Sequence, residues 1–150
     1  MSIFKYNDIN LFYEVKGNPN SKKVVAFFNG VMASTSSWGL LYPIFEKLDY
    51  KIILHDFKGQ FKSDKPEGPY TFEEHVLEAK ALFDFLGVKK VNIVGTSYGE
   101  EINMKFAYMF PKMVNSLSLI NSVSKLNEIV KGFVAGWKVY CDTKDGETFF

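Results

Sequence analysis

The sequence contains no arginine, and all 18 of its basic residues are lysine. Arginine is the side chain that reads phosphate and guanine through two parallel hydrogen bonds, so its absence argues against nucleic-acid recognition. The lysines are balanced by 17 acidic residues, which leaves a formal net charge of +1. Such a balance gives no general attraction to nucleic acid or to an anionic membrane. We therefore expect neither nucleic acid nor a membrane as a partner.

A single cysteine and the lack of long apolar runs exclude two further classes of protein. Cys141 alone cannot form an internal disulfide, which excludes a secreted scaffold held by such bridges. The N-terminal residues include Lys5 and Asp8 and have no apolar core, unlike a signal peptide. The longest apolar runs, such as residues 24–28, are far too short to span a membrane. We expect a soluble, cytoplasmic protein.

Segments typical of strands alternate with segments typical of helices. Residues 9–15 alternate apolar and polar side chains, as a half-buried strand does. Four short apolar runs are typical of strands covered on both faces. These runs are residues 24–28, 50–54, 91–94 and 117–120. The order predicts an α/β fold with a mostly parallel sheet and flanking helices.

Three helices are predicted between these strands. Thr71 and Glu74 form a capping box, and apolar residues then recur at three- and four-residue steps as far as Leu86. A second helix is expected at residues 98–110, before a proline, and a third after Trp38. Each helix follows one strand and precedes the next, as right-handed crossovers between parallel strands require.

The most informative motif is Gly95-Thr-Ser97-Tyr-Gly99, which follows a predicted buried strand and opens a predicted helix. This is the arrangement of a nucleophile elbow, in which a sharp turn lifts a serine hydroxyl above the sheet. Gly95 and Gly99 suit it because strand and helix approach too closely there for a side chain. The helix also directs its amide groups toward a developing oxyanion. Ser97 is therefore a candidate catalytic nucleophile; the alternative is a simple tight turn.

Two further segments accompany this motif. The strand at 24–28 is followed by Asn29-Gly30-Val31, and residues 55–66 read His-Asp-Phe-Lys-Gly-Gln-Phe-Lys-Ser-Asp-Lys-Pro. Together and in this order, the three segments resemble the α/β-hydrolase fold family, in its serine hydrolase or esterase-like form. The resemblance covers roughly residues 3–150. It implies an oxyanion hole formed by the backbone N–H groups of Val31 and Tyr98, on a turn made by Asn29 and Gly30.

Four positions depart from the pattern of that family. Asn29 stands where histidine is usual, and asparagine tolerates unusual turn geometry. Lys58 replaces an arginine and Phe61 a glycine, which alters the anchoring of their loop and leaves the nucleophile unchanged. Glu100 replaces a second glycine after the elbow. It is either a first-turn acid favoured by the helix dipole or a carboxylate that tunes the pocket.

The sequence lacks a histidine after Ser97; its only two are His55 and His75. A serine nucleophile needs a base within hydrogen-bond reach, itself oriented by a carboxylate. In the family that the chain resembles, the order is serine, acid, histidine, and neither histidine fits it. We expect His55 to pack or to anchor a loop, and His75 to be solvated or partly buried. No acid after Ser97 occupies a recognisable catalytic position.

The last part of the chain resembles the opening of the lid that this family inserts after its sixth strand. Residues 123–140 have a helical pattern with one broad apolar face. We expect residues 1–122 to form the N-terminal part of the core, with about six of eight strands, and residues 123–150 to begin a helical lid. On this interpretation the chain stops inside the lid, at Phe149-Phe150. The pocket candidates are Trp38, Phe133 and Trp137.

These features predict a serine hydrolase for a small apolar carbonyl substrate: an ester, thioester, lactone or C–C bond beside a carbonyl. No zinc-type spacing, calcium loop or nucleotide-binding glycine pattern is found, so we expect neither metal nor cofactor. Without a base, the chain should be inactive alone. The alternatives are a non-catalytic binding module and one half of a two-chain hydrolase. An exposed sheet edge would then favour self-association or a complementing C-terminal chain.

Overall fold

Six strands form one sheet in the computed structural model, which describes residues 2–121, 123 and 125–143. The strands are β1 (Ser2–Tyr6), β2 (Ile9–Gly17), β3 (Val24–Phe28), β4 (Lys51–His55), β5 (Val91–Thr96) and β6 (Val114–Ile120). Their order across the sheet is β1-β2-β4-β3-β5-β6. The pairs β1–β2 and β2–β4 are antiparallel, whereas β3–β4, β3–β5 and β5–β6 are parallel. The predicted six-stranded, mostly parallel sheet is confirmed.

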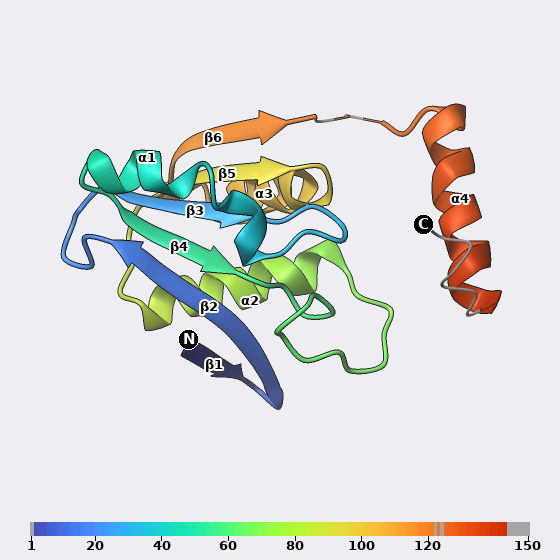
Figure 1. Ribbon diagram of the computed structural model, residues 1–150, viewed down its shortest axis with the longest axis horizontal. Coiled ribbons are helices and arrows are strands. Elements are labelled where there is room, and N and C mark those ends of the chain that lie inside the picture. The colour runs from blue at the N-terminus through green and yellow to red at the C-terminus, as the bar shows by residue number, and fades with distance from the viewer. Residues whose placement is uncertain (1, 122, 124, 144–150) are drawn as a thin grey trace.

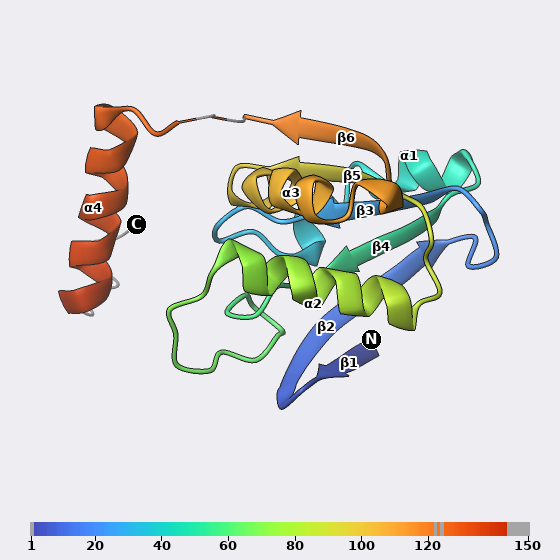
Figure 2. The ribbon, with the colours of Figure 1, turned by 180° about the vertical axis from the view of Figure 1, so that it is seen from behind.

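Helices cover both faces of this sheet. The helices α2 (Phe72–Phe85) and α3 (Tyr98–Met109) lie on one face, and α1 (Tyr42–Lys47) lies on the other (Figures 1 and 2). Two short 3₁₀ helices, η1 (Thr35–Trp38) and η2 (Pro111–Met113), follow β3 and α3. Because both faces are covered, β3 is buried along its whole length, which explains its unbroken run of apolar residues.

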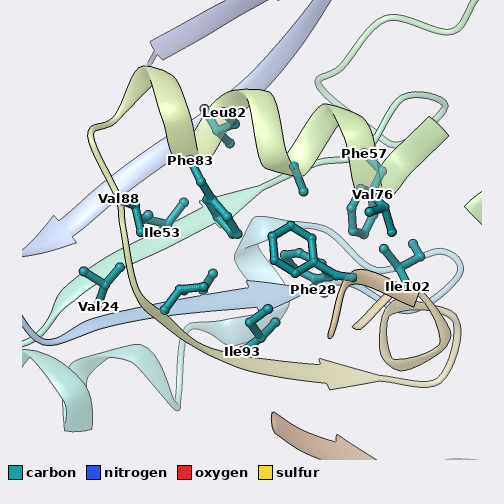
Figure 3. Packing of buried hydrophobic residues seen from close by; sticks show 14 residues of the cluster. Val24, Phe28, Ile53, Phe57, Val76, Leu82, Phe83, Val88, Ile93 and Ile102 are labelled. Atoms are coloured by element: carbon teal, nitrogen blue, oxygen red, sulfur yellow. The ribbon is translucent and has the colours of Figure 1, made fainter. Parts of the chain in front are cut away.

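The main core lies between the sheet and the helices α2 and α3 (Figure 3). Phe28, at the end of β3, is at its centre and is fully buried. Its ring lies 5.2 Å from that of Phe57 and 6.3 Å from those of Phe83 and Phe106, measured between centroids. Aromatic rings at such separations contribute packing energy beyond their buried area. This packing holds the end of β3 beneath the loops that follow the strands.

The predicted start of α2 is confirmed in detail. Glu74 N–H donates to Thr71 Oγ1 at 3.2 Å, and Thr71 N–H donates to Glu74 Oε2 at 2.7 Å. This reciprocal pair satisfies two amide groups that the first helical turn leaves without partners. The strand β1, in contrast, has no counterpart among the predicted strands. It pairs only with β2 at one edge of the sheet, so its side chains remain largely exposed and its apolar pattern is weak.

The helix predicted for residues 123–140 is confirmed as α4 (Glu128–Thr143), which begins later than its apolar pattern does. Both views show it standing apart from the sheet (Figures 1 and 2). The predicted boundary at residue 122 and the terminal pair Phe149-Phe150 lie outside the described residues. Among the helices that the structure describes, none has the length and apolar character needed to cross a bilayer.

Candidate active site

Ser97 occupies a sharp turn between the end of β5 and the start of α3. Its backbone has φ 50° and ψ −123°, a positive φ that is uncommon for a residue with a side chain. Two backbone hydrogen bonds hold this turn: Ser97 N–H donates to Ile120 O at 3.1 Å, and Glu100 N–H donates to Ser97 O at 3.0 Å. Ser97 is exposed, although its neighbours in β5 and α3 are largely buried. This is the strained strand–turn–helix geometry predicted for the elbow.

The two glycines of the motif permit a close approach of backbone segments. A Cβ atom on Gly99 would lie 2.2 Å from Phe28 O and 2.6 Å from Asn29 O. A Cβ atom on Gly95 would lie 2.2 Å from the side-chain amide of Asn103 and 2.9 Å from the carbonyl carbon of Gly99. Both positions therefore exclude a side chain, because α3 passes directly over the ends of β3 and β5.

Asn103 closes the elbow and was not foreseen from the sequence. It is fully buried on α3. In the amide orientation that satisfies both partners, its oxygen accepts from Gly95 N–H at 2.8 Å and its nitrogen donates to Gly99 O at 3.3 Å. One side chain thus joins the strand side of the elbow to its helix side. The available signal was a polar residue beside Ile102 and one turn before Phe106, on the buried face of α3.

The turn after β3 lies against the elbow, as the oxyanion-hole prediction requires. A Cβ atom on Gly30 would lie 3.3 Å from Thr96 O and 3.5 Å from Ser97 Cβ. Val31 follows Gly30 directly, and Tyr98 opens α3, where an amide has no acceptor within its own helix. The fold therefore brings the residues of both predicted donors to the side of Ser97. The role of their N–H groups in holding an oxyanion remains a prediction.

Asn29 is a buried hydrogen-bond centre rather than a residue chosen for turn geometry. Its Nδ2 lies within donating distance of three oxygens: His55 O at 2.9 Å, Gln60 Oε1 at 3.1 Å and Asp56 Oδ1 at 3.2 Å. Its Oδ1 accepts from the indole N–H of Trp38 at 2.7 Å. Asn29 is absent from the residues with positive φ. Its side chain ties β3 to the loop after β4, which sequence reasoning did not anticipate.

Trp38, expected from the sequence as a pocket residue, instead belongs to the core. It is 4% exposed and its ring packs 4.8 Å from that of Phe27, on the face of the sheet covered by α1. The other two pocket candidates, Phe133 and Trp137, lie on α4 and are 63% and 44% exposed. The structure therefore does not bring these three residues together around Ser97. The spacing of apolar residues in α4 is that of an amphipathic helix, and contact with a substrate is not needed to explain it.

A cavity of about 770 Å³ lies beside the elbow. It is bounded by the turn after β3, the loop after β4, and the first turns of α2 and α3. Its lining includes both residues of the predicted oxyanion hole. Most of the other lining side chains are apolar or aromatic, a character typical of small-molecule sites. They include Met32, Phe57, Phe61, Tyr70 and His75.

A buried charged cluster lies at one side of this cavity. Lys58 Nζ lies 3.2 Å from Glu78 Oε1 and 3.4 Å from Glu74 Oε1, and Glu78 Oε2 lies 3.1 Å from His75 Nδ1. Burial alone would lower the pKa of Lys58, but Glu78 and then Glu74 outweigh it and raise that pKa above its ordinary value. Lys58 is 7% exposed and Glu78 2%. The ion pair therefore joins the loop after β4 to α2 at a point where water is largely excluded.

The expectation that His75 is solvated or partly buried is wrong. The side chain is 1% exposed, because the Glu78 carboxylate bonds its Nδ1 and aromatic rings surround it. His55 is a packing residue, as expected, with its ring 4.6 Å from that of Phe57. Neither of its ring nitrogens has a hydrogen-bond partner among the described residues. Burial, and then the nearby His75, lowers the pKa of His55 to about 3.

His55 should make folding sensitive to acid. Its folded-state pKa is about 3, whereas an unfolded histidine titrates near its ordinary value of 6.5. Between these values the unfolded chain binds one more proton, so stability falls as pH falls, by up to about 1.4 kcal/mol per pH unit. We expect urea unfolding to show a shallower pH dependence between pH 6.5 and about 4 for His55→Leu than for the natural chain. Equal slopes for the two proteins would contradict this prediction.

Among the described residues, no three His, Cys, Asp or Glu side chains are grouped in a way that could hold a metal ion. The groups that this site offers for chemistry are an exposed serine, two nearby backbone amide groups and a mostly apolar cavity. The region is held in place by the buried side chains of Asn29 and Asn103.

Comparisons with known proteins agree on one family. Residues 23–143 match the family described as alpha/beta hydrolase fold. The chain is 26% identical over 121 residues to 3-oxoadipate enol-lactonase 2 of Acinetobacter baylyi, covering 81% of this chain and 45% of that protein. It is 31% identical over 94 residues to a poly(3-hydroxyalkanoate) depolymerase of Ectopseudomonas oleovorans, covering 61% of this chain and 32% of that protein.

A solved structure agrees over nearly the whole chain. It is that of an alpha/beta hydrolase enzyme from a Medee basin deep-sea metagenome library, 34% identical to this chain with a TM-score of 0.91. The likeness covers 99% of this chain and 54% of that one. The chain thus spans about half the length, or less, of these relatives. The family match, the shared sheet and the close structural agreement establish that the chain belongs to the alpha/beta hydrolase fold family.

Proposed function

We propose that this chain carries the nucleophile and the oxyanion-binding groups of a serine hydrolase that acts on an apolar carbonyl compound. The observation that carries the proposal is the exposed Ser97, held at φ 50° between β5 and the first turn of α3. The adjoining cavity, mostly apolar, suits an ester, a thioester, a lactone or a ketone with a scissile C–C bond. Relatives named as an enol-lactonase and as a depolymerase are consistent with such chemistry.

The proposed reaction begins when Ser97 Oγ attacks the carbonyl carbon and passes its proton to a general base. The carbonyl oxygen becomes an oxyanion, which the backbone N–H groups of Val31 and Tyr98 stabilise together with the positive end of the α3 dipole. Collapse of this intermediate expels the leaving group, which takes the proton from the base. Water then releases the acyl group from Ser97 in the same way and regenerates the hydroxyl.

The base is proposed to come from outside these 150 residues. Neither histidine of the chain is available for the role. His55 is buried in the core with a pKa of about 3, and His75 makes no hydrogen bond to Ser97 among the described residues. A general base contributes about 10²- to 10⁴-fold to such reactions. The chain alone should therefore turn over esters slowly or not at all.

A chimera tests the proposal. This chain is joined to the part of the deep-sea relative that lies outside their match, and hydrolysis of p-nitrophenyl butyrate is followed for the chimera and for the chain alone. We expect the chimera to be at least about 100-fold faster, since the proposal places the base, and the acid that orients it, in that part of the relative.

Folding must be compared alongside activity. Circular dichroism and sedimentation of both proteins show whether the chain alone is a folded monomer, so that low activity is not a result of aggregation. Equal turnover by the two folded proteins would overturn the idea that the base lies outside the chain. A folded chimera without any activity would favour the alternative of a non-catalytic binding module.

A further inference from the structure

His75 is a polar group embedded in the aromatic wall of the cavity beside the elbow. It lies in the first turns of α2 and is one of the residues that line the cavity. Its ring centroid lies 5.0 Å from that of Phe57, 5.8 Å from that of Tyr98 and 6.0 Å from that of Tyr70. A polar ring in such surroundings costs free energy unless its nitrogens find partners.

Glu78 determines which ring nitrogen of His75 carries the proton. Glu78 Oε2 lies 3.1 Å from His75 Nδ1, and a carboxylate can only accept, so the proton belongs on Nδ1. The other oxygen, Oε1, is paired with Lys58 Nζ at 3.2 Å. With its proton on Nδ1, the neutral ring of His75 presents Nε2 as a hydrogen-bond acceptor.

The basic side chains that line the cavity are already engaged. Lys58 is held by Glu78 and Glu74 and lies over the Tyr70 ring at 5.1 Å from its centroid. Lys65 Nζ donates to the backbone carbonyls of its own loop at 2.6 Å and 3.1 Å. Neither lysine is therefore placed as a free cation for a charged substrate.

The amide and phenol groups of the wall are mostly engaged as well. Gln60 Oε1 accepts from Phe57 N–H at 3.1 Å, and Gln60 Nε2 donates to Gly30 O at 2.9 Å. The Tyr70 hydroxyl donates to the backbone of its own loop. Among the described residues, no hydrogen bond involves His75 Nε2 or the Tyr98 hydroxyl. Burial and then nearby carboxylates raise the pKa of Tyr98 to about 12, so this hydroxyl keeps its proton.

We propose that the cavity recognises a hydroxyl group on the carbonyl substrate, with His75 Nε2 accepting a hydrogen bond from it. The proposal rests on the proposed function, because it assumes that the cavity beside Ser97 holds the substrate. A hydroxyl matches this wall because it can donate to His75 Nε2 and accept from the Tyr98 hydroxyl. The apolar and aromatic side chains of the lining, such as Met32, Phe57 and Phe61, would hold the hydrocarbon part of the same molecule. The substrate class is thus a hydroxylated, otherwise apolar carbonyl compound.

The test uses nuclear magnetic resonance of the chain labelled with ¹⁵N-histidine, at pH 8. With only two histidines in the sequence, each ring nitrogen can be assigned, and His55 serves as an internal control. The probes are 4′-(hydroxymethyl)acetophenone and 4′-(methoxymethyl)acetophenone, which differ by one methyl group in place of the donated proton. We expect His75 Nε2 to lack a bonded proton in the free chain. Its resonance should shift with the hydroxyl probe, which should bind about tenfold more tightly than the methyl ether.

Two variants separate recognition from a merely structural role. His75→Asn keeps a donor near Glu78 and removes the group at Nε2, so it should abolish the preference for the hydroxyl probe. His75→Gln places an amide oxygen near the position of Nε2 and should restore part of the preference. A proton on Nε2 in the free chain, equal affinity for the two probes, or an unchanged preference in His75→Asn would each overturn the inference.

These outcomes are distinct from failure of the proposed function. The binding measurement needs neither a base nor turnover, so it can succeed when the chimera does not hydrolyse esters. In that case the cavity binds a hydroxylated ligand without catalysis. A chimera that hydrolyses p-nitrophenyl butyrate while the chain shows no preference between the probes would overturn the inference about His75 alone.

Discussion

Replacing Ser97 by alanine in the active chimera is expected to lower the turnover of p-nitrophenyl butyrate at least about a thousandfold. The hydroxyl is the atom that attacks the carbonyl in the proposed reaction, and other groups do not replace a lost nucleophile. Removing the exposed Oγ leaves the elbow intact, because the hydrogen bonds that hold the turn involve only the backbone of Ser97. The midpoint of urea unfolding should therefore change little.

Ser118→Ala is the matched control for this experiment. Ser118 is exposed on the neighbouring strand β6, where it is paired in register with Val94 of β5. Its replacement removes the same atoms a short distance from the elbow and should leave turnover within about twofold. If Ser97→Ala keeps more than about a tenth of the chimera's activity at unchanged stability, Ser97 is not the nucleophile. Turnover is measured with the ester in excess, so that weaker binding is not mistaken for slower chemistry.

Gly99→Ala is expected to abolish folding of the chain or to lower its unfolding free energy by at least about 3 kcal/mol. The added Cβ would lie 2.2 Å from Phe28 O and 2.6 Å from Asn29 O, both backbone atoms of the central strand and the turn after it. No rotamer change relieves such a contact, so α3 would have to move away from β3. That movement would also loosen the packing around Phe28. Urea unfolding followed by circular dichroism measures the effect.

Gly136→Ala supplies the control with the same chemical change. Gly136 lies in α4, and a Cβ there would meet no atom within 4 Å. Alanine is favoured over glycine inside a helix by roughly 0.5–1 kcal/mol, so this variant should be neutral or slightly stabilised. Similar unfolding curves for Gly99→Ala and Gly136→Ala would show that the close approach of α3 to β3 is not needed for stability.

The elbow could be predicted because its determinants are close together in the sequence. A buried strand, two glycines around Ser97 and a helix immediately afterwards lie within a few residues of one another. Their spacing alone specifies a turn that is too tight for side chains at Gly95 and Gly99. The same locality explains the confirmed capping box at Thr71, whose partner Glu74 is on the first turn of the same helix.

The buried polar contacts could not be predicted, because they join segments that are distant in sequence. The residues next to Asn29 in the sequence predicted a role in a turn. In the structure its side-chain amide lies within hydrogen-bond distance of Gln60 and His55, which are far from it in sequence. Trp38 was a candidate for the pocket, whereas in the structure its indole N–H donates to Asn29 and its ring packs in the core. Asn103 is one of two polar residues, with Glu100, on the buried face of α3. The role of its side chain, which joins Gly95 to Gly99 by hydrogen bonds, depends on how β5 and α3 pack in the folded chain.

Local sequence pattern was thus sufficient for the order of the strands β2 to β6 and of the helices between them, the elbow around Ser97 and the resemblance to a family of hydrolases. Periodicity, caps and glycine positions act over a few residues, and they specify these features before the chain folds. The cavity, the Lys58–Glu78–His75 cluster and the exclusion of water from His55 arose only in the folded chain. They depend on burial and on contacts between α2, the loop after β4 and the elbow, which the topology of the sheet brings together.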